Sequence, residues 1–194
     1  MVVLVILVCL YGAGTVYRNS VWSDGVSLWS DAARKSPKSS RAYTNLGTEY
    51  ARLGRNDMAI SSFLKALRFS NNEDGADPAN IHYNLGTVYQ QTGSYELALR
   101  EYRIVTDLRP ADFRPYYNLG VIYQQRGEKE SAMDAYKRVI ERNASHFKSY
   151  HNIGLLYQNS GDMVLAQEFY RKALSLNPDY SRSRINLGVI MEAK

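Results

Sequence analysis

The chain has 194 residues, enough for one ordinary domain, and 45% of them are hydrophobic, enough for a continuous core. A net charge of +5 is too small for the dense basic clusters of nucleic-acid-binding proteins, so we expect no nucleic-acid partner. The single cysteine, Cys9, excludes an intrachain disulfide.

Residues 1–17 are apolar and predict a hydrophobic anchor helix. No charged side chain occurs between Val2 and Tyr17. A helix of that length rises about 24 Å, slightly less than a bilayer core of about 30 Å. We interpret the segment as a transmembrane helix, single-pass if Met1 is the true start. The alternative is a buried helix that caps the end of the protein.

The side of the membrane is left open by the charge pattern. Arg18, Arg34 and Lys35 follow the apolar segment, and the positive-inside rule would place the rest of the chain in the cytoplasm. That rule loses force if further membrane helices precede Met1. A cleaved signal peptide is disfavoured, because no Lys or Arg precedes the apolar run.

Residues 18–39 predict a junction followed by one helix. Trp22, Val26 and Trp29 recur at helical spacing, and Pro37 follows the last turn. Trp29 and Pro37 occupy the places that aromatic residues and proline hold in later parts of the chain. This segment is therefore interpreted as the second helix of a degenerate repeat.

Residues 40–194 contain a motif that is repeated, in four full units and a final first helix. Gly86, Gly120, Gly154 and Gly188 follow one another at steps of 34 residues, a period typical of stacked helical hairpins. Each unit has a Leu–Gly pair (Ile–Gly at Ile153), a Tyr three places after the Gly, a second Gly, and then an Ala with an aromatic residue four places on. In one unit these are Leu119, Gly120, Tyr123, Gly127, Ala132 and Tyr136.

This pattern resembles the tetratricopeptide repeat family from about Trp22 to the end of the chain. The resemblance implies an all-α fold, an α-α superhelix whose concave wall is made by the first helices. Between the first two units, residues 71–77 add an acidic surface loop, either a tolerated insertion or a contact loop. The last helix has no partner helix behind it, so Ile185, Val189 and Ile190 are expected to be partly bare. Oligomerisation through this helix is one expectation; a longer natural chain is another.

An asparagine stands two places before the Leu–Gly glycine of every unit. A carboxamide both donates and accepts hydrogen bonds, so a row of them can bind the backbone of an extended peptide. The row resembles the asparagine ladder in the repeats of O-GlcNAc transferases, which implies binding of extended polypeptide. The alternative is that these side chains bond neighbouring helices. The row consists of Asn45, Asn84, Asn118, Asn152 and Asn186.

Other polar side chains are predicted to flank this row in the groove, and a basic rim suits an acidic peptide. The arrangement does not match the dicarboxylate clamp of chaperone-binding relatives, because Tyr and Thr or Val occupy the clamp positions. The flanking side chains are Tyr83, Tyr117, His151, Gln90, Gln124 and Gln158, with Arg114 and Lys148 on the rim.

No catalytic, metal or cofactor site is predicted. The three histidines have no Cys or carboxylate at ligand spacing, and every Gly is explained by hairpin geometry. We therefore do not expect the chain itself to be an enzyme. The expected function is that of a membrane-anchored scaffold that binds an extended peptide or a partner protein.

A second resemblance supplies an alternative function. The run from Tyr17 to Asp24 and the residues behind it look like the junction in polytopic membrane glycosyltransferases that end in tetratricopeptide repeats, such as transmembrane-and-TPR O-mannosyltransferases. That resemblance implies a substrate-recognition region of a protein O-glycosyltransferase. It favours the extracytoplasmic side of the membrane, contrary to the charge pattern.

Overall fold

The computed structural model describes residues 24–70 and 76–192. The predicted anchor helix over residues 1–17, and most of the predicted loop over residues 71–77, lie outside these ranges. Among the described residues, no helix is both long enough and apolar enough to span a bilayer.

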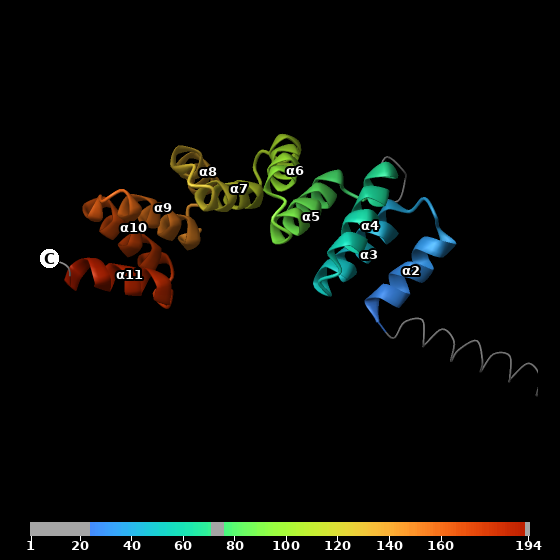
Figure 1. Ribbon diagram of the computed structural model, residues 1–194, viewed down its shortest axis with the longest axis horizontal. Coiled ribbons are helices and arrows are strands. Elements are labelled where there is room, and N and C mark those ends of the chain that lie inside the picture. Colours follow the sequence, from blue (N-terminus) through green and yellow to red (C-terminus); the bar gives the residue numbers. More distant parts are fainter. Residues whose placement is uncertain (1–23, 71–75, 193–194) are drawn as a thin grey trace, which may run out of the picture. The chain divides into compact units, whose positions relative to one another are not determined.

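All the regular elements in the described part of the chain are α-helices, which confirms the predicted all-α class (Figure 1). Their bounds are α2 (Gly25–Lys35), α3 (Ser40–Arg52), α4 (Asn56–Arg68), α5 (Pro78–Gln91), α6 (Tyr95–Leu108), α7 (Phe113–Gln125), α8 (Lys129–Arg142), α9 (Phe147–Asn159), α10 (Met163–Leu176) and α11 (Ser181–Glu192).

The chain divides between Gly93 and Ser94 into two compact units. In the first unit α2 packs on α3, α3 pairs with α4, and α4 packs on α5. In the second unit α6 packs on α7, α7 pairs with α8, α9 pairs with α10, and α11 packs on α10. Within each unit, helices thus contact their neighbours in sequence, as expected for a helical repeat array.

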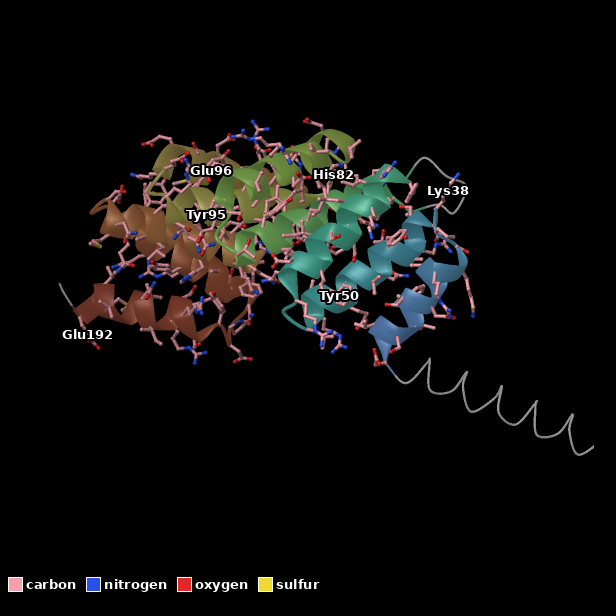
Figure 2. The ribbon with its side chains drawn as sticks, turned by 45° about the vertical axis from the view of Figure 1, so that its right-hand side comes forward. Lys38, Tyr50, His82, Tyr95, Glu96 and Glu192 are labelled. Atoms are coloured by element: carbon pink, nitrogen blue, oxygen red, sulfur yellow. The ribbon has the colours of Figure 1, made fainter. Side chains whose placement is uncertain are left out.

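One ion-pair network joins α6 to α7 within the second unit. Glu96, in the first turn of α6 (Figure 2), lies 3.0 Å from Arg126 Nη1 at the end of α7. Arg126 Nε also lies 2.6 Å from Glu128. These groups are largely exposed, so the network adds little stability compared with the buried contacts.

A glycine ends the first helix of each hairpin. Gly54, Gly93, Gly127 and Gly161 follow the first helix of each hairpin and have φ angles of 70°, 76°, 75° and 81°. This left-handed conformation is disfavoured for residues with a Cβ atom and accessible to glycine. The chain therefore turns at these positions, and after Gly54, Gly127 and Gly161 the second helix packs back on the first.

In three of the first helices, an internal glycine permits close packing of an aromatic ring. A Cβ atom built on Gly120 would lie 2.6 Å from Tyr136 Cε1, far closer than normal contact. A Cβ on Gly154 would meet Tyr170 at 2.8 Å, and one on Gly47 would meet Phe63. These rings are fully buried. The distance between the two helices of a hairpin is therefore limited by a ring lying on a glycine.

The last helix is packed on one side only. Ile185, Val189 and Met191 of α11 are exposed, whereas Ile190 is buried against Ala166 and Tyr170 of α10. A Cβ atom on Gly188 would have no described neighbour within 4 Å. The expectation of an incompletely covered helix is met for Ile185 and Val189 and not for Ile190. Oligomerisation through this helix stays a prediction.

We expect Gly120→Ala to destabilise the protein, because the buried Tyr136 ring cannot move away from the new methyl group. The expected loss of unfolding free energy is about 1–3 kcal/mol. Gly188→Ala is the matched control, since it makes the same change in the same motif without a ring above it. It should be neutral or stabilise by up to about 1 kcal/mol through helix propensity. Urea unfolding followed by circular dichroism measures both, and equal midpoints for the two variants would contradict the packing argument.

Candidate functional site

The five predicted asparagines lie at equivalent places on the first helices α3, α5, α7, α9 and α11. All five residues are half-buried. Their hydrogen bonds, however, divide them into two groups.

In the second unit, the side chains of Asn152 and Asn186 bond to tyrosines of the preceding second helix. Asn186 Nδ2 donates to the Tyr170 hydroxyl at 3.1 Å, and the same hydroxyl donates to Gln158 Oε1 at 2.5 Å. The preceding repeat has the same arrangement, in which the Tyr136 hydroxyl donates to Gln124 Oε1 at 2.7 Å. Asn152 also hydrogen-bonds to Tyr136. Each tyrosine hydroxyl thus links the first helix of its own hairpin to the first helix of the next.

These tyrosine hydroxyls stay protonated and act as donors. Burial raises the pKa of Tyr136, and the nearby Tyr117 raises it further, while the hydrogen bond from Asn152 opposes the rise. Burial also raises the pKa of Tyr170, and Asn186 opposes it. Because a phenol has one O–H donor, that donor is occupied by the glutamine in both repeats. Asn152 and Asn186 are therefore already engaged within the protein.

The first unit differs, because its equivalent aromatic residues carry no phenol hydroxyl. The residues that precede Asn45 and Asn84 at the place of Tyr136 are Trp29 and Phe63. Among the described residues, neither Asn45 nor Asn84 has a side-chain hydrogen-bond partner. Their carboxamides are accordingly available to a ligand. Asn118 is not counted with these two, since it has an interaction within the protein.

Tyr117 is half-buried and belongs to the bonded group. Its ring lies 6.0 Å from the Tyr136 ring and 4.8 Å from the His146 ring, measured between centroids. Burial raises the pKa of Tyr117, and a hydrogen bond from Asn152 opposes the rise. In the first unit, Tyr83 and Gln90 of α5 are also half-buried.

His151 lies between helices and only 5% of its surface is exposed. Its Nδ1 is 2.9 Å from Ser183 Oγ on α11, and its ring contacts Tyr170 and Tyr180 at 5.4 and 5.1 Å between centroids. Burial lowers the pKa of His151 to about 4, helped by the charge of Arg182. The sequence analysis placed this histidine on the groove wall, whereas the structure places it inside the stack, where it contacts the next repeat.

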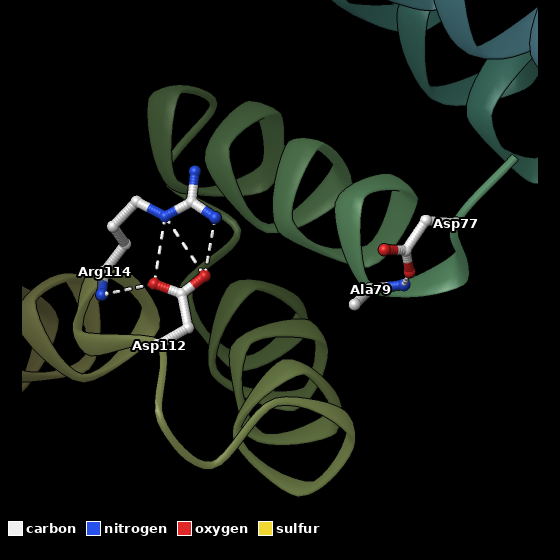
Figure 3. A network of polar contacts seen from close by, with 4 residues as sticks. All are labelled: Asp77, Ala79, Asp112 and Arg114. Atoms are coloured by element: carbon white, nitrogen blue, oxygen red, sulfur yellow. Dashed lines mark hydrogen bonds and ion pairs between the residues drawn. The ribbon is translucent and has the colours of Figure 1, made fainter.

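The predicted basic rim is partly neutralised. Figure 3 shows that the Arg114 guanidinium binds both carboxylate oxygens of Asp112, with Nε at 2.9 and 3.1 Å and Nη2 at 2.6 Å. The same carboxylate caps α7, because it accepts a hydrogen bond from the backbone N–H of Arg114 at 3.0 Å. Asp77 caps α5 in the same way by accepting a hydrogen bond from the backbone N–H of Ala79 at 2.8 Å. Hydrogen bonds from Arg114 lower the pKa of Asp112. Lys148 is exposed.

Sequence reasoning missed the tyrosine hydroxyls as polar participants and treated the rings only as packing residues. The signal was present in the series Trp29, Phe63, Tyr102, Tyr136 and Tyr170, in which a hydroxyl is present from the third member onward. In the described ranges, 24–70 and 76–192, no group of three His, Cys, Asp or Glu residues could hold a metal ion.

We expect His151 to make stability depend on pH. Its pKa is about 4 in the folded protein, below its ordinary value near 6.5, so between these pH values the unfolded chain binds more protons. Unfolding free energy should therefore fall as the pH is lowered from 6.5 towards 4. His151→Gln keeps a polar side chain without this titration, so the variant should lose part of the decrease. Parallel curves for the two proteins in urea unfolding across this range would contradict the expectation.

The comparisons with known proteins agree with the fold. Family models described as tetratricopeptide repeat match residues 38–111, 113–146 and 147–180. No curated protein sequence matches the chain significantly.

Three solved structures illustrate the likeness. MamA from Desulfovibrio magneticus is 24% identical, with a TM-score of 0.71 over 86% of this chain and 96% of that chain. YrrB, described as a tetratricopeptide repeat protein with an unusual peptide-binding site, is 22% identical, with a TM-score of 0.69 over 92% and 86%. The C-terminal part of a repeat-containing protein from Cytophaga hutchinsonii is 18% identical, with a TM-score of 0.75 over 93% and 69%. At these identities the likeness concerns the fold alone.

Together with the family matches, which span most of the sequence, the helical array shows that the chain belongs to the tetratricopeptide repeat family.

Proposed function

We propose that the chain is a non-catalytic scaffold that binds an extended segment of a partner protein through Asn45 and Asn84. Tetratricopeptide repeat proteins are typically scaffolds of this kind. The observation that carries the proposal is that these two half-buried carboxamides have no intramolecular side-chain partner among the described residues. A carboxamide that is partly withdrawn from water and unpaired gains more from a ligand hydrogen bond than a fully solvated one.

The proposed ligand is the extended main chain of a peptide, because the carboxamides of Asn45 and Asn84 can both donate and accept hydrogen bonds. Each carboxamide offers donors and an acceptor, which matches the N–H and C=O that every peptide residue presents. Binding of this kind reads the main chain and depends little on the peptide's side chains. The description of YrrB as having a peptide-binding site concerns that protein, and the proposal extends this class of ligand to the present chain.

We expect the double variant Asn45→Ala/Asn84→Ala to lose peptide affinity without losing stability. The probe is a dodecapeptide selected from a random display library on the wild-type chain. Loss of the backbone hydrogen bonds should weaken its binding about tenfold, equivalent to about 1.4 kcal/mol. The unfolding midpoint should stay unchanged, because neither side chain is used inside the fold.

Asn186→Ala is the matched control, since its side chain bonds to Tyr170. This change should lower stability by about 0.5–1.5 kcal/mol and leave peptide affinity unaltered. Phe63→Tyr is a converse test, because a new hydroxyl can engage Asn84 and should weaken peptide binding. If Asn45→Ala/Asn84→Ala binds the probe as tightly as the wild type, the two asparagines do not form the site.

We further propose that residues 1–17 anchor this scaffold in a membrane. The support is the uncharged apolar run between Val2 and Tyr17 in the sequence. The full chain should float with liposomes in a density gradient, also in high salt. A variant that lacks residues 1–17 should stay in the aqueous fraction, and flotation of that variant would contradict the assignment.

A second candidate is the substrate-recognition region of a membrane protein O-glycosyltransferase, on the extracytoplasmic side. It rests on the resemblance of the junction after Tyr17, and none of the described contacts bears on it. The genomic reading frame separates the two candidates. A frame that continues upstream of Met1 and encodes many further membrane helices would favour the second.

A further inference from the structure

A pocket of about 440 Å³ lies over α7, between α6 and α8, within the second unit. Its floor contains Tyr116, Leu119 and Tyr123, which recur at helical spacing on one side of α7. Asn118 points about 200° away from Tyr116 around the helix, as follows from 3.6 residues per turn. The pocket is therefore on a different face from the asparagine row.

The next repeat contains the same site with a phenyl ring in it. A step of 34 residues relates Tyr116 and Tyr123 to Tyr150 and Tyr157 of α9. There the Phe169 ring lies 5.5 Å from Tyr157, stacked at 27°, and 6.3 Å from Tyr150, measured between ring centroids. The same step relates Phe169 to Ala135, whose methyl group leaves the equivalent space over α7 open.

The basic residue at the rim is conserved in position between the two sites. Arg138 lies with its guanidinium carbon 6.0 Å from the Tyr116 ring, and Lys172 lies with its Nζ 5.9 Å from the Tyr150 ring. The two sites thus share an aromatic pair and a cation beside it. The site over α7 lacks the ring, since Ala135 stands in its place, and its Tyr116 ring also has the guanidinium carbon of Arg142 at 4.2 Å from its centroid.

The rim also carries a cation without a carboxylate partner. Arg103 of α6 donates from Nη2 to the Tyr123 hydroxyl at 2.8 Å, which is a neutral acceptor. Among the described residues no carboxylate forms an ion pair with Arg103, whereas Arg138 is paired with Asp134 at 2.8 Å. A carboxylate on a ligand would find a charge-assisted hydrogen-bond donor at Arg103.

From these observations we infer that the pocket over α7 is a second binding site, which takes an aromatic side chain flanked by Glu or Asp from a partner protein. The ring would lie between Tyr116 and Tyr123, as Phe169 lies between Tyr150 and Tyr157. The neighbouring carboxylate would pair with Arg103. A pocket of this volume has the size usual for ligand sites, and its aromatic floor with a few polar groups has their usual composition.

The test uses a labelled, end-blocked peptide with one Phe between two Glu residues, flanked by Ser and Gly, and the full chain in lipid nanodiscs. Fluorescence anisotropy should show saturable binding to the wild type. Ala135→Phe fills the pocket with the ring that the next repeat already accommodates, so the affinity for the peptide should fall at least about tenfold. Arg103→Gln removes the cation that would pair with the peptide's carboxylate, and it should weaken binding about three- to tenfold. Lys137→Gln, one repeat further on, is the matched control and should change nothing.

Peptide variants keep the inference testable if Ala135→Phe does not fold. Replacing the peptide's Phe by Ala, or both of its Glu residues by Gln, should each weaken binding. The Asn45→Ala/Asn84→Ala variant should bind this peptide normally, because the two sites are separate. A negative result for the pocket over α7 would therefore leave the proposed function standing. A negative result for Asn45 and Asn84 would likewise leave the pocket standing. Undiminished binding to folded Ala135→Phe would overturn the inference. So would concentration-dependent self-association that Ala135→Phe abolishes, because a second copy would then be the occupant.

Discussion

The contact of an aromatic ring with a helical glycine is the constraint on which the other features of this protein depend. Because no Cβ intervenes, the Tyr136 ring lies on the Gly120 backbone and the two helices of the hairpin approach closely. The ring is fully buried, so its position is determined by its surroundings on all sides. The repeat carries this contact at Gly47 and Gly154 as well, which gives the hairpins in both units the same local geometry.

The same ring also decides the chemistry of the asparagine row. The packing of the Tyr136 ring directs its hydroxyl towards the first helices of two hairpins. There the hydroxyl donates a hydrogen bond to Gln124 and is hydrogen-bonded to Asn152. A Tyr therefore converts the next asparagine into a link between repeats, and a Phe or Trp leaves that asparagine unengaged. The presence of one hydroxyl group on a buried ring thus decides whether the next asparagine is bonded within the protein or is available to a ligand. One row of identical residues is therefore used for contacts between repeats in one unit and left without side-chain partners in the other.

A difference in side-chain size at Ala135 has a comparable effect on another face of the array. Its equivalent Phe169 completes the packing over α9, and the smaller side chain leaves the space over α7 open without disturbing the ring-on-glycine contact beneath it. A repeat array tolerates such differences, because each hairpin is stabilised mainly by its own contacts and those of its neighbours. A pocket can therefore arise where a packing residue is replaced by a smaller one.

Much of this protein could be predicted from residue spacing, since the 34-residue period, the glycine caps and the Leu–Gly pairs specify helical hairpins through local backbone geometry and periodicity. The all-α fold and the arrangement in helical hairpins were determined in this way. The use of each polar side chain was not, because hydrogen-bond partners such as Tyr170 and Asn186 come from different helices and depend on where the packed ring directs its hydroxyl. His151 shows the same limit: its spacing is that of an exposed residue, and only the packing of α11 over it made it a buried one. Sequence periodicity thus determined the array, whereas contacts between successive hairpins decided which of its polar groups remain available to a partner.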